Sequence, residues 1–369
     1  MHALLIPVLV MLAVACGGAP TSSGAQTNAT DNGSRYYPGA SWRTADPPAV
    51  GFNVNGLSRL RTDVAAGRWG SVHGVIIVRN GWLVHEQYAG WSAATPHTMQ
   101  SVTKSITSLL YGMATGGGAG GALDRPVLEL FARYPSVANT DARKRALTMR
   151  HLLTMRTAMD FWEQPYNGSP LQVMNNSSAD WTKYILDRPM TGEPGSGWAY
   201  NSGAAILVGS AIREITGEQP DVFARRALFA PIGVTGETWF RAPFDGLPHT
   251  GGGLALKPLD LARVGYLVLR HGAWNDTQVV PRAWLDSSVV AVTHGSPVFW
   301  ANDGAGYGRF WWLFPTTRGG RDDGVIAASG SGGQWLFVVP SLDLVVAIVA
   351  ANGDGLGVLY DGVLPALRR

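Results

Sequence analysis

Apolar residues recur with different periods along the chain, and each change of period predicts a change of secondary structure. Residues 75–78 and 83–88 are apolar-rich runs of strand length on either side of Asn80-Gly81, a dipeptide that favours a tight hairpin turn. They predict a β-hairpin over residues 73–90. Four more strands are predicted near the C-terminus, where β-branched and aromatic runs alternate with turn residues: 307–314, 324–329, 335–339 and 344–350.

The middle of the chain has helical spacing instead, and residues 123–250 are predicted to be mostly helical. Apolar residues three and four positions apart predict helices over these segments: 54–69, 98–113, 147–155, 181–186, 204–216, 258–271 and 358–367. The helix at 98–113 follows Pro96, and Thr98 stands where a capping residue is expected. The predicted fold class is α+β. It combines an α/β sandwich, whose antiparallel sheet is built from both termini, with an all-helical lobe inserted at roughly residues 123–250.

The composition fits one large globular domain. The chain has 369 residues, of which 46% are hydrophobic and 15% are charged, and this is enough apolar material for a sizeable core. The formal net charge is only +3 and no extended run of Lys or Arg occurs, so nucleic acid is not expected as a partner. The 14 Trp and 47 Gly residues predict aromatic-lined surfaces and many tight turns, as an enzyme cleft would have.

The first residues are not expected to belong to the folded domain. An apolar stretch over residues 3–15 is too short to span a bilayer and ends in small residues before Cys16, so residues 1–16 resemble a bacterial lipoprotein signal. Cys16 is the only cysteine, which excludes an intramolecular disulfide and favours lipidation of its thiol. A plain secretory peptide is the alternative, because no Lys or Arg precedes the apolar stretch and Ala13 stands where Leu is commoner.

The segment after Cys16 has the composition of a linker. Residues 17–35 are rich in Gly, Ser, Thr, Asn and Ala and are predicted to form a flexible tether, which leaves residues 36–369 as the folded domain. The expected location is the bacterial cell envelope. There the exported protein would be anchored to the membrane through a lipid on Cys16, in the periplasm or at the cell surface.

The most informative polar residues lie at the start of the helix predicted over residues 98–113. Ser101 and Lys104 are three positions apart, so both side chains project from the same face of the helix. A serine hydroxyl becomes a strong nucleophile when a base takes its proton, and a lysine is such a base once burial lowers its pKa towards neutrality. Ser-x-x-Lys therefore predicts nucleophile and base at the positive end of a helix dipole. A serine that only caps the helix is the structural alternative.

Two later segments carry groups that such a serine needs. Tyr200 lies in a Gly-rich loop before a predicted helix, and its phenol could relay a proton to the leaving group if a nearby ammonium lowered its pKa. Residues 328–334, Ala-Ser-Gly-Ser-Gly-Gly-Gln, join two predicted strands and would let a substrate lie against main-chain N–H groups. The ordinary alternatives are that Tyr200 is an aromatic residue of the core or rim, and that residues 328–334 form a glycine turn.

Motifs of other hydrolases and of nucleotide-binding proteins are absent. The sequence contains no H-E-x-x-H, G-x-S-x-G or phosphate-loop motif. His85-Glu86 has no second His at metal-binding spacing, so both residues are interpreted as parts of a strand.

Together these elements resemble the serine β-lactamase and penicillin-binding-protein superfamily, in its class C-like branch. S-x-x-K is followed by Y-x-S at Tyr200 and then by a Gly-rich strand segment near the C-terminus. Three segments resemble the family's LTxxHLLTMxSG, FxYSNxxxxLLG and GGGLxxxxxDLARxG patterns: 147–157, 198–209 and 251–265. The resemblance covers roughly residues 45–366. Its motif style is most similar to the branch that contains 6-aminohexanoate-dimer hydrolase and related esterases.

Carried over residue by residue, the resemblance implies that Ser101 is the acylated nucleophile, Lys104 its base and Tyr200 the general acid and base. The main-chain N–H groups of Ser101 and Ser331 would form the oxyanion hole. The implied supporting or substrate-binding residues are Ser202, Ser329 and Gly330. The family implies no metal and no cofactor, and an active site between the α/β sandwich and the helical lobe.

Two positions depart from the family pattern. Ser202 replaces the Asn of the tyrosine motif; it can still hydrogen-bond Lys104, but it lacks the amide that grips a penicillin-like side chain. Ala328-Ser329-Gly330 replaces Lys-Thr-Gly, so the cation that holds a substrate carboxylate is missing. The upstream candidates to replace that cation are Arg318 and Arg321.

The expected activity is therefore hydrolysis of a small-molecule ester or linear amide through an acyl-enzyme on Ser101. Hydrolysis of β-lactams or D-Ala-D-Ala peptides is the weaker variant, because the strand cation is missing. A surface-anchored module that binds a ligand without chemistry is the alternative of another class, favoured by the tether and the aromatic content. The candidates for the rim of the cleft are Asp160, Trp162 and Tyr166.

Overall fold

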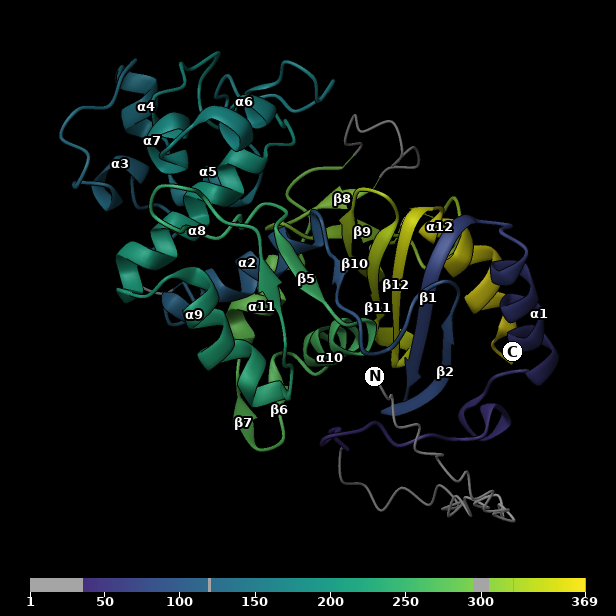
Figure 1. Ribbon diagram of the computed structural model, residues 1–369. Coiled ribbons are helices and arrows are strands. Elements are labelled where there is room, and N and C mark those ends of the chain that lie inside the picture. Colours follow the sequence, from purple (N-terminus) through teal and green to yellow (C-terminus); the bar gives the residue numbers. More distant parts are fainter. Residues whose placement is uncertain (1–35, 119–120, 295–304, 321, 369) are drawn as a thin grey trace, which may run out of the picture. The chain divides into compact units, whose positions relative to one another are not determined.

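A seven-stranded antiparallel sheet joins the two ends of the described chain (Figure 1). The computed structural model describes residues 36–118, 121–294, 305–320 and 322–368, all within one unit, residues 33–369. The strands, in their order across the sheet, are β2 (Trp82–Tyr88), β1 (Gly70–Arg79), β12 (Leu344–Gly353), β11 (Gln334–Val339), β10 (Val325–Gly330), β9 (Trp312–Phe314) and β8 (Gly306–Tyr307). The predicted sheet built from both ends of the chain is confirmed.

The central strands are apolar at nearly every position because both faces of the sheet are covered. Every residue of β11 and the first seven of β12 are buried. Helix α10 (Pro258–Leu269) packs on one face, where a Cβ atom at Gly265 would lie 2.6 Å from the Leu336 side chain. Trp335 neighbours Leu336 on β11, so its side chain points to the opposite face of the sheet. On that face, a Cβ atom at Gly355 would lie 2.1 Å from the Trp335 ring.

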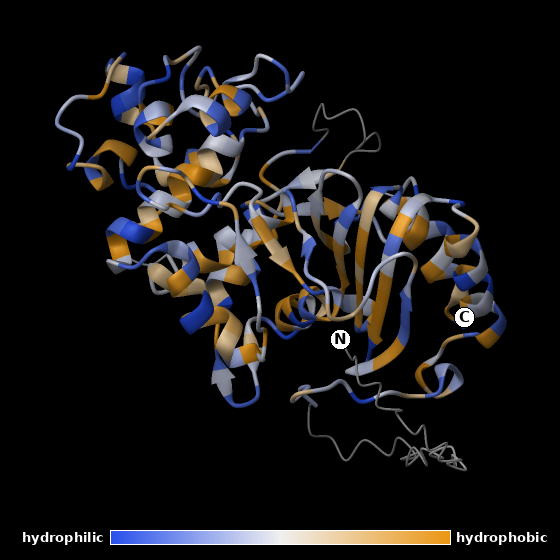
Figure 2. Ribbon diagram, viewed as in Figure 1, coloured by the Kyte–Doolittle hydropathy of each residue, from blue (hydrophilic) through white to orange (hydrophobic). Residues whose placement is uncertain are grey.

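The helices at the two ends of the folded unit pack against each other beside the sheet. Helix α1 (Val54–Ala65) contacts the C-terminal helical segment, which contains α12 (Gly355–Gly357), a π-helical stretch (Val358–Val363) and a 3₁₀ turn (Leu364–Ala366). Figure 2 shows apolar residues along the central strands and on the inner surfaces of the helices that cover them. The helical prediction for residues 358–367 is confirmed, in the form of π and 3₁₀ turns instead of a regular α-helix.

Residues between the two sets of strands form the helical part of the fold (Figure 1). Its helices are α3 (Val127–Leu130), α4 (Ala142–Ala146), α5 (Met149–Leu153), α6 (Pro170–Ser177), α7 (Trp181–Leu186), α8 (Ser202–Thr216) and α9 (Pro220–Ala224). The first eleven residues of α8 are all buried, because this helix packs against α2 (Val102–Ala114) and α5. Asn201 caps α8 by accepting a hydrogen bond from the N–H of Ala204 at 2.9 Å.

A second, three-stranded sheet connects the helix that carries Ser101 to a glycine-rich turn far along the chain. Its order is β3 (His97–Thr98), β5 (Leu254–Leu256) and β4 (Thr238–Trp239). The remaining elements are α11 (Arg282–Ser288), β6 (Ala273–Trp274), β7 (Thr277–Gln278), a π-helical stretch (Arg225–Phe229) and the 3₁₀ turns Pro47–Val50, Ala230–Ile232 and Pro340–Leu342. No helix among the described residues is both long and apolar enough to cross a membrane.

Two local predictions are wrong. Thr98 does not cap α2, because it pairs with Ala255 as a strand residue and the helix starts at Val102. The segment 307–314 is not one strand, because Phe310 has a φ of 64° and the chain turns there between β8 and β9. The lipoprotein-type signal, the tether and Cys16 lie outside the described residues.

Candidate active site

Ser101 lies directly before the first residue of α2, with its side chain at the surface of a pocket. Its hydroxyl makes no capping hydrogen bond to the helix, so the structural alternative of a simple cap does not hold. Instead the Nζ atom of Lys104 lies 2.8 Å from Ser101 Oγ, and the helical spacing of the two residues produces this contact.

Lys104 is buried, with only 1% of its surface exposed. Its Nζ atom also donates to the carbonyl oxygen of Gly251 at 2.6 Å and lies 4.7 Å from the centre of the Tyr200 ring. Burial lowers the pKa of Lys104 to about 8, and the negative charge of Glu163 partly opposes this shift. At neutral pH a minority of the molecules therefore has the unprotonated amine that a general base needs.

The small sheet and the start of α2 fix the position of this pair. The Met99 N–H donates to the carbonyl of Leu254 at 2.8 Å, and the Thr107 hydroxyl donates to the carbonyl of Thr250 at the same distance. Gln100 adopts a positive φ of 46°, which is costly for a residue with a side chain and marks the sharp bend before Ser101. These contacts hold the Gly251 carbonyl beside Lys104.

Tyr200 is partly buried and lies close to Lys104. Its ring stacks on Trp312 with centroids 6.1 Å apart and meets Tyr307 edge-on at 6.5 Å, so an aromatic cluster fixes the phenol. Burial, and then the charge of Glu163, raise the pKa of Tyr200 above its usual range, while a hydrogen bond with Ser101 opposes this shift. The condition of an ammonium that lowers this pKa is therefore not met, and burial favours the protonated phenol.

Glu163 is a site residue that the sequence analysis missed. Its carboxylate accepts hydrogen bonds from the N–H and the hydroxyl of Ser202, both at 2.8 Å. The Ser202 hydroxyl, which is also able to bond Lys104, is directed to Glu163 instead. The only hint in the sequence was its place between Trp162 and Tyr166, two candidates for the rim.

The other implied site residues lie at the end of β10. Ser331 follows this strand and lines the pocket together with Ser101, and neither main-chain N–H donates a hydrogen bond within the described residues. Gly330 lets the chain before the serine approach closely, because a Cβ atom there would lie 2.3 Å from the Met99 carbonyl oxygen. Ser329 is 9% exposed and lies within β10, outside the pocket lining.

The pocket beside Ser101 has a volume of about 510 Å³. Its lining is mainly polar, with these side chains besides the serines: Thr98, Gln100, Glu163, Gln164, Tyr166, Asn175 and His249. Leu171 and Phe240 add apolar surface, and no Trp, Lys or Arg of the described chain lines the pocket. Of the aromatic residues, Tyr166 and Phe240 line the pocket, whereas Trp198 and Trp312 pack in the aromatic cluster around Tyr200.

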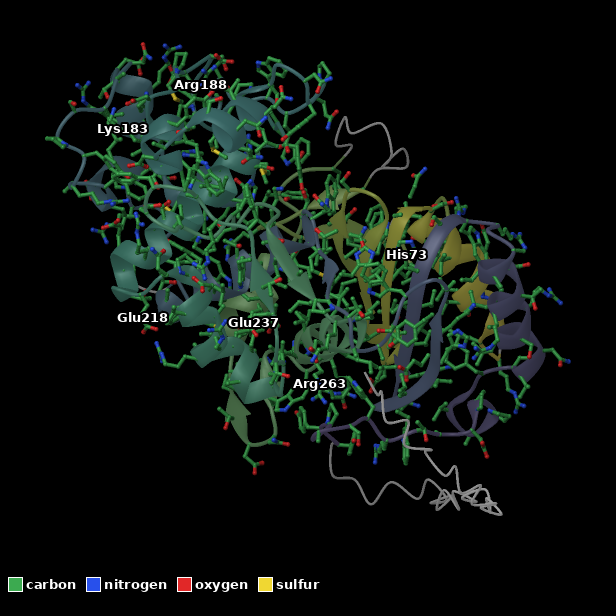
Figure 3. The ribbon with its side chains drawn as sticks, in the orientation of Figure 1. His73, Lys183, Arg188, Glu218, Glu237 and Arg263 are labelled. Carbon is green, nitrogen blue, oxygen red and sulfur yellow. The ribbon has the colours of Figure 1, made fainter. Side chains whose placement is uncertain are left out.

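Three candidates for the rim have different surroundings. Tyr166 lines the pocket, whereas Trp162 is 43% exposed and lies outside the lining. Asp160 pairs at 2.6 Å with Arg188, which Figure 3 labels on the helical part. Arg318 pairs with Asp361 on the surface, and Arg321 lies outside the described residues. Among the described residues, no Lys or Arg therefore lines the pocket in place of the missing strand lysine.

His85 and Glu86 are strand residues, as predicted. His85 Nε2 lies 3.1 Å from Gln87 Oε1 inside β2, and Glu86 accepts a hydrogen bond from the Tyr88 hydroxyl at 2.8 Å. Within the part of the chain that the structure describes, no three His, Cys, Asp or Glu side chains group closely enough to hold a metal ion.

Known proteins share this sequence pattern and this fold. A model of the family described as Beta-lactamase matches residues 61–359. A 6-aminohexanoate-dimer hydrolase of Paenarthrobacter ureafaciens is 22% identical over 299 residues, covering 76% of this chain and 72% of that protein. EstCE1, described as a hydrolase with promiscuous acyltransferase activity, is 17% identical with a TM-score of 0.67, covering 85% of this chain and 97% of its own. A D-stereospecific amidohydrolase from Streptomyces sp. is 16% identical with a TM-score of 0.64, covering 84% and 99% respectively.

Proposed function

The chain belongs to the beta-lactamase family, and from that premise we propose that it is a serine hydrolase that cleaves a small ester or linear amide through an acyl-enzyme on Ser101. The names of its relatives, which include a 6-aminohexanoate-dimer hydrolase and an amidohydrolase, support hydrolysis of this kind. The reaction needs an activated serine, a proton path to the leaving group and donors for the oxyanion.

One contact carries the proposal. The Lys104 Nζ atom lies 2.8 Å from Ser101 Oγ, and burial holds the lysine pKa at about 8. Near neutral pH a fraction of the molecules therefore has an unprotonated amine. That amine accepts the hydroxyl proton while Oγ forms a bond to the substrate carbonyl carbon.

Collapse of the tetrahedral intermediate needs two further groups. The negative charge on the former carbonyl oxygen would be stabilised by the main-chain N–H groups of Ser101 and Ser331. The Tyr200 phenol, which burial keeps protonated, would give its proton to the departing oxygen or nitrogen and take back the proton held by Lys104. Water would then attack the acyl carbon, releasing a carboxylic acid and restoring the Ser101 hydroxyl.

The charge of the pocket favours an ester or linear amide over a β-lactam. A β-lactam or a D-Ala-D-Ala peptide carries a carboxylate beside the scissile bond, and a buried carboxylate needs a cationic partner. Glu163 is the acidic residue of the lining, and none of its described members is a Lys or Arg. A substrate carboxylate would therefore be repelled where the family pattern would attract it.

Intact-protein mass spectrometry after treatment with a fluorophosphonate tests the proposal. Wild type is expected to gain one adduct, and Ser101→Ala is expected to gain none and to lose turnover of 4-nitrophenyl butyrate. A folded wild type without an adduct would contradict the proposal and favour the binding module. Turnover of a chromogenic cephalosporin that disappears in Ser101→Ala would instead establish the β-lactamase variant.

A further inference from the structure

The pocket beside Ser101 contains buried polar atoms that have no hydrogen-bond partner among the described residues. His249 lines the pocket with only 6% of its surface exposed, and neither ring nitrogen bonds to another residue in the described part of the chain. Asn175 lines the same pocket, and its buried Oδ1 atom likewise has no partner within residues 36–118, 121–294, 305–320 and 322–368. Such atoms are rare because each one costs folding free energy, and a ligand that supplies the partners recovers that cost.

Trp181 brings these two residues into the same neighbourhood. Its ring meets the His249 imidazole edge-on with centroids 5.2 Å apart, and its indole N–H donates to the carbonyl of Met174 at 3.1 Å. Met174 directly precedes Asn175 on α6, so one tryptophan contacts the histidine and anchors the helix that carries the asparagine.

The remaining sides of the imidazole are closely packed. The ring of Phe240 lies 6.0 Å from it, and a Cβ atom at Gly253 would lie 2.8 Å from the Cβ atom of His249. The glycine run 251–253 therefore wraps around the histidine and fixes its position. His249 also lines the pocket, so the pocket is the side from which a ligand approaches the imidazole.

The donors and acceptors of this region define the ligand that fits. Burial, and then the nearby charge of Lys104, lower the pKa of His249 to about 4, while a contact with its own main chain opposes the shift. The ring is therefore neutral at pH 7 and offers one N–H donor and one acceptor, and Asn175 Oδ1 adds an acceptor. A carboxylate would meet these acceptors and Glu163, and the described lining offers it no Lys or Arg. An amide group, which has a carbonyl oxygen beside an N–H, matches the pattern.

We propose that His249 and Asn175 form a subsite for a second, non-scissile amide group of the substrate. The His249 N–H donates to the carbonyl oxygen of that amide, and Asn175 Oδ1 accepts its N–H. The substrate class is thus an ester or amide that carries one more amide, such as an ester of an N-acylated amino acid. This inference rests on the proposed function, because it specifies the substrate of the same site.

Two pairs of length-matched chromogenic esters test the subsite. In the first pair the acyl group is 4-acetamidobutanoyl or heptanoyl, with 4-nitrophenol as the leaving group. In the second pair an N-acetylated or purely aliphatic chain is attached to the leaving phenol. Wild type is expected to turn over the amide-bearing member of one pair with a kcat/KM at least about tenfold above that of its aliphatic partner.

The variants separate this inference from the proposed function. Asn175→Leu and His249→Leu are each expected to reduce that preference about tenfold. His249→Asn keeps a donor and an acceptor, so it is expected to retain more of the preference than His249→Leu. Asn176→Leu is the matched control, because Asn176 is exposed on the same helix, and it is expected to keep the preference. Ester turnover without an amide preference in wild type, or a preference unchanged in Asn175→Leu and His249→Leu, would overturn the subsite. Loss of all turnover and labelling in wild type would instead overturn the proposed function.

Discussion

The Glu163 carboxylate holds Ser202 by two hydrogen bonds, one from the main-chain N–H and one from the hydroxyl, both 2.8 Å long. Ser202 starts α8 two residues after Tyr200, so the carboxylate fixes the end of the loop that carries the phenol. The charge of Glu163 also raises the pKa of Lys104, because it favours the ammonium, and that of Tyr200, because it disfavours a phenolate. One side chain therefore acts on both proposed proton-transfer groups.

The rate of acylation is expected to rise with pH and to reach half of its maximum near pH 8. The active form has an unprotonated Lys104, and burial lowers the pKa of that lysine to about 8, so the active fraction grows as pH passes through this value. The measurement is the pre-steady-state release of 4-nitrophenol between pH 6 and pH 10. Lys104→Arg stays protonated across this range, so its acylation rate is expected to be at least about a hundredfold below that of wild type. A rate independent of pH in wild type would contradict the role of Lys104 as base.

Glu163→Gln is expected to shift this pH profile towards lower pH. Removing the negative charge removes the influence that raises the pKa of Lys104, so the unprotonated amine is reached at a lower pH than in wild type. The glutamine retains hydrogen-bonding capacity towards Ser202, which limits structural change. Glu193→Gln, an exposed change in the same part of the chain, is the control and is expected to leave the midpoint in place. A midpoint that moves upwards in Glu163→Gln would show that its charge does not act on Lys104.

The sequence was sufficient for those features of the fold that depend on local pattern. The hairpin turn at Asn80-Gly81 was predictable because two consecutive positive φ values, 52° and 77°, favour this dipeptide. Helix α7 has the predicted bounds, and the Ser101–Lys104 contact follows from helical spacing alone. The sheet from both termini was predictable because its strands are apolar runs that the helical segments separate.

Features that depend on distant contacts were missed or wrong. Glu163 reaches Ser202 across 39 positions of sequence, and no local pattern distinguishes it from a surface glutamate. Thr98 looked like a cap, but pairing with Ala255, far along the chain, makes it a strand residue. The unpartnered nitrogens of His249 are a property of the packed pocket. The sequence feature nearest to His249 was the family-like segment 251–265, which begins two residues after it.

Acid is expected to destabilise the protein through buried His85. Burial, and then the charge of Arg61, lower its pKa to about 4 from about 6.5. Between these values the unfolded chain binds more protons than the folded one, so stability is lost as pH falls from 6.5 to 4, by about 3 kcal/mol. In urea titrations, His85→Gln is expected to lose correspondingly less free energy of unfolding over this pH interval than wild type does. His294→Gln, at an exposed histidine, is the control, and an unchanged pH dependence in His85→Gln would contradict the assignment.

Cys16 is expected to anchor the protein to the membrane, as the resemblance of residues 1–16 to a lipoprotein signal predicts. Full-length protein expressed in a bacterium should enter the membrane fraction and incorporate a labelled fatty acid. Cys16→Ala should abolish both, because no other cysteine can carry the lipid. Export of wild type in soluble form, without incorporated fatty acid, would favour the plain secretory peptide.

Gly330→Ala is expected to disturb the nucleophile while changing no reacting group. The added Cβ atom would lie 2.3 Å from the Met99 carbonyl oxygen and 3.0 Å from Gln100 Cβ, so β10 or the segment leading to Ser101 must move. Overpacking of this kind costs about 1–3 kcal/mol of stability. A small displacement of a reacting atom lowers the rate up to about a hundredfold, which fluorophosphonate labelling of Ser101 measures.

Gly39→Ala is the matched control for this change, because a Cβ atom at Gly39 would meet nothing within 4 Å. It is expected to keep both the stability and the labelling rate of wild type. The two readouts separate the possible causes, since denaturant titration reports the overpacking and labelling reports the position of Ser101. If Gly330→Ala lost stability but labelled at the wild-type rate, the clash would be relieved by β10 alone. The close approach of this strand to Met99 would then have no role in positioning the serine.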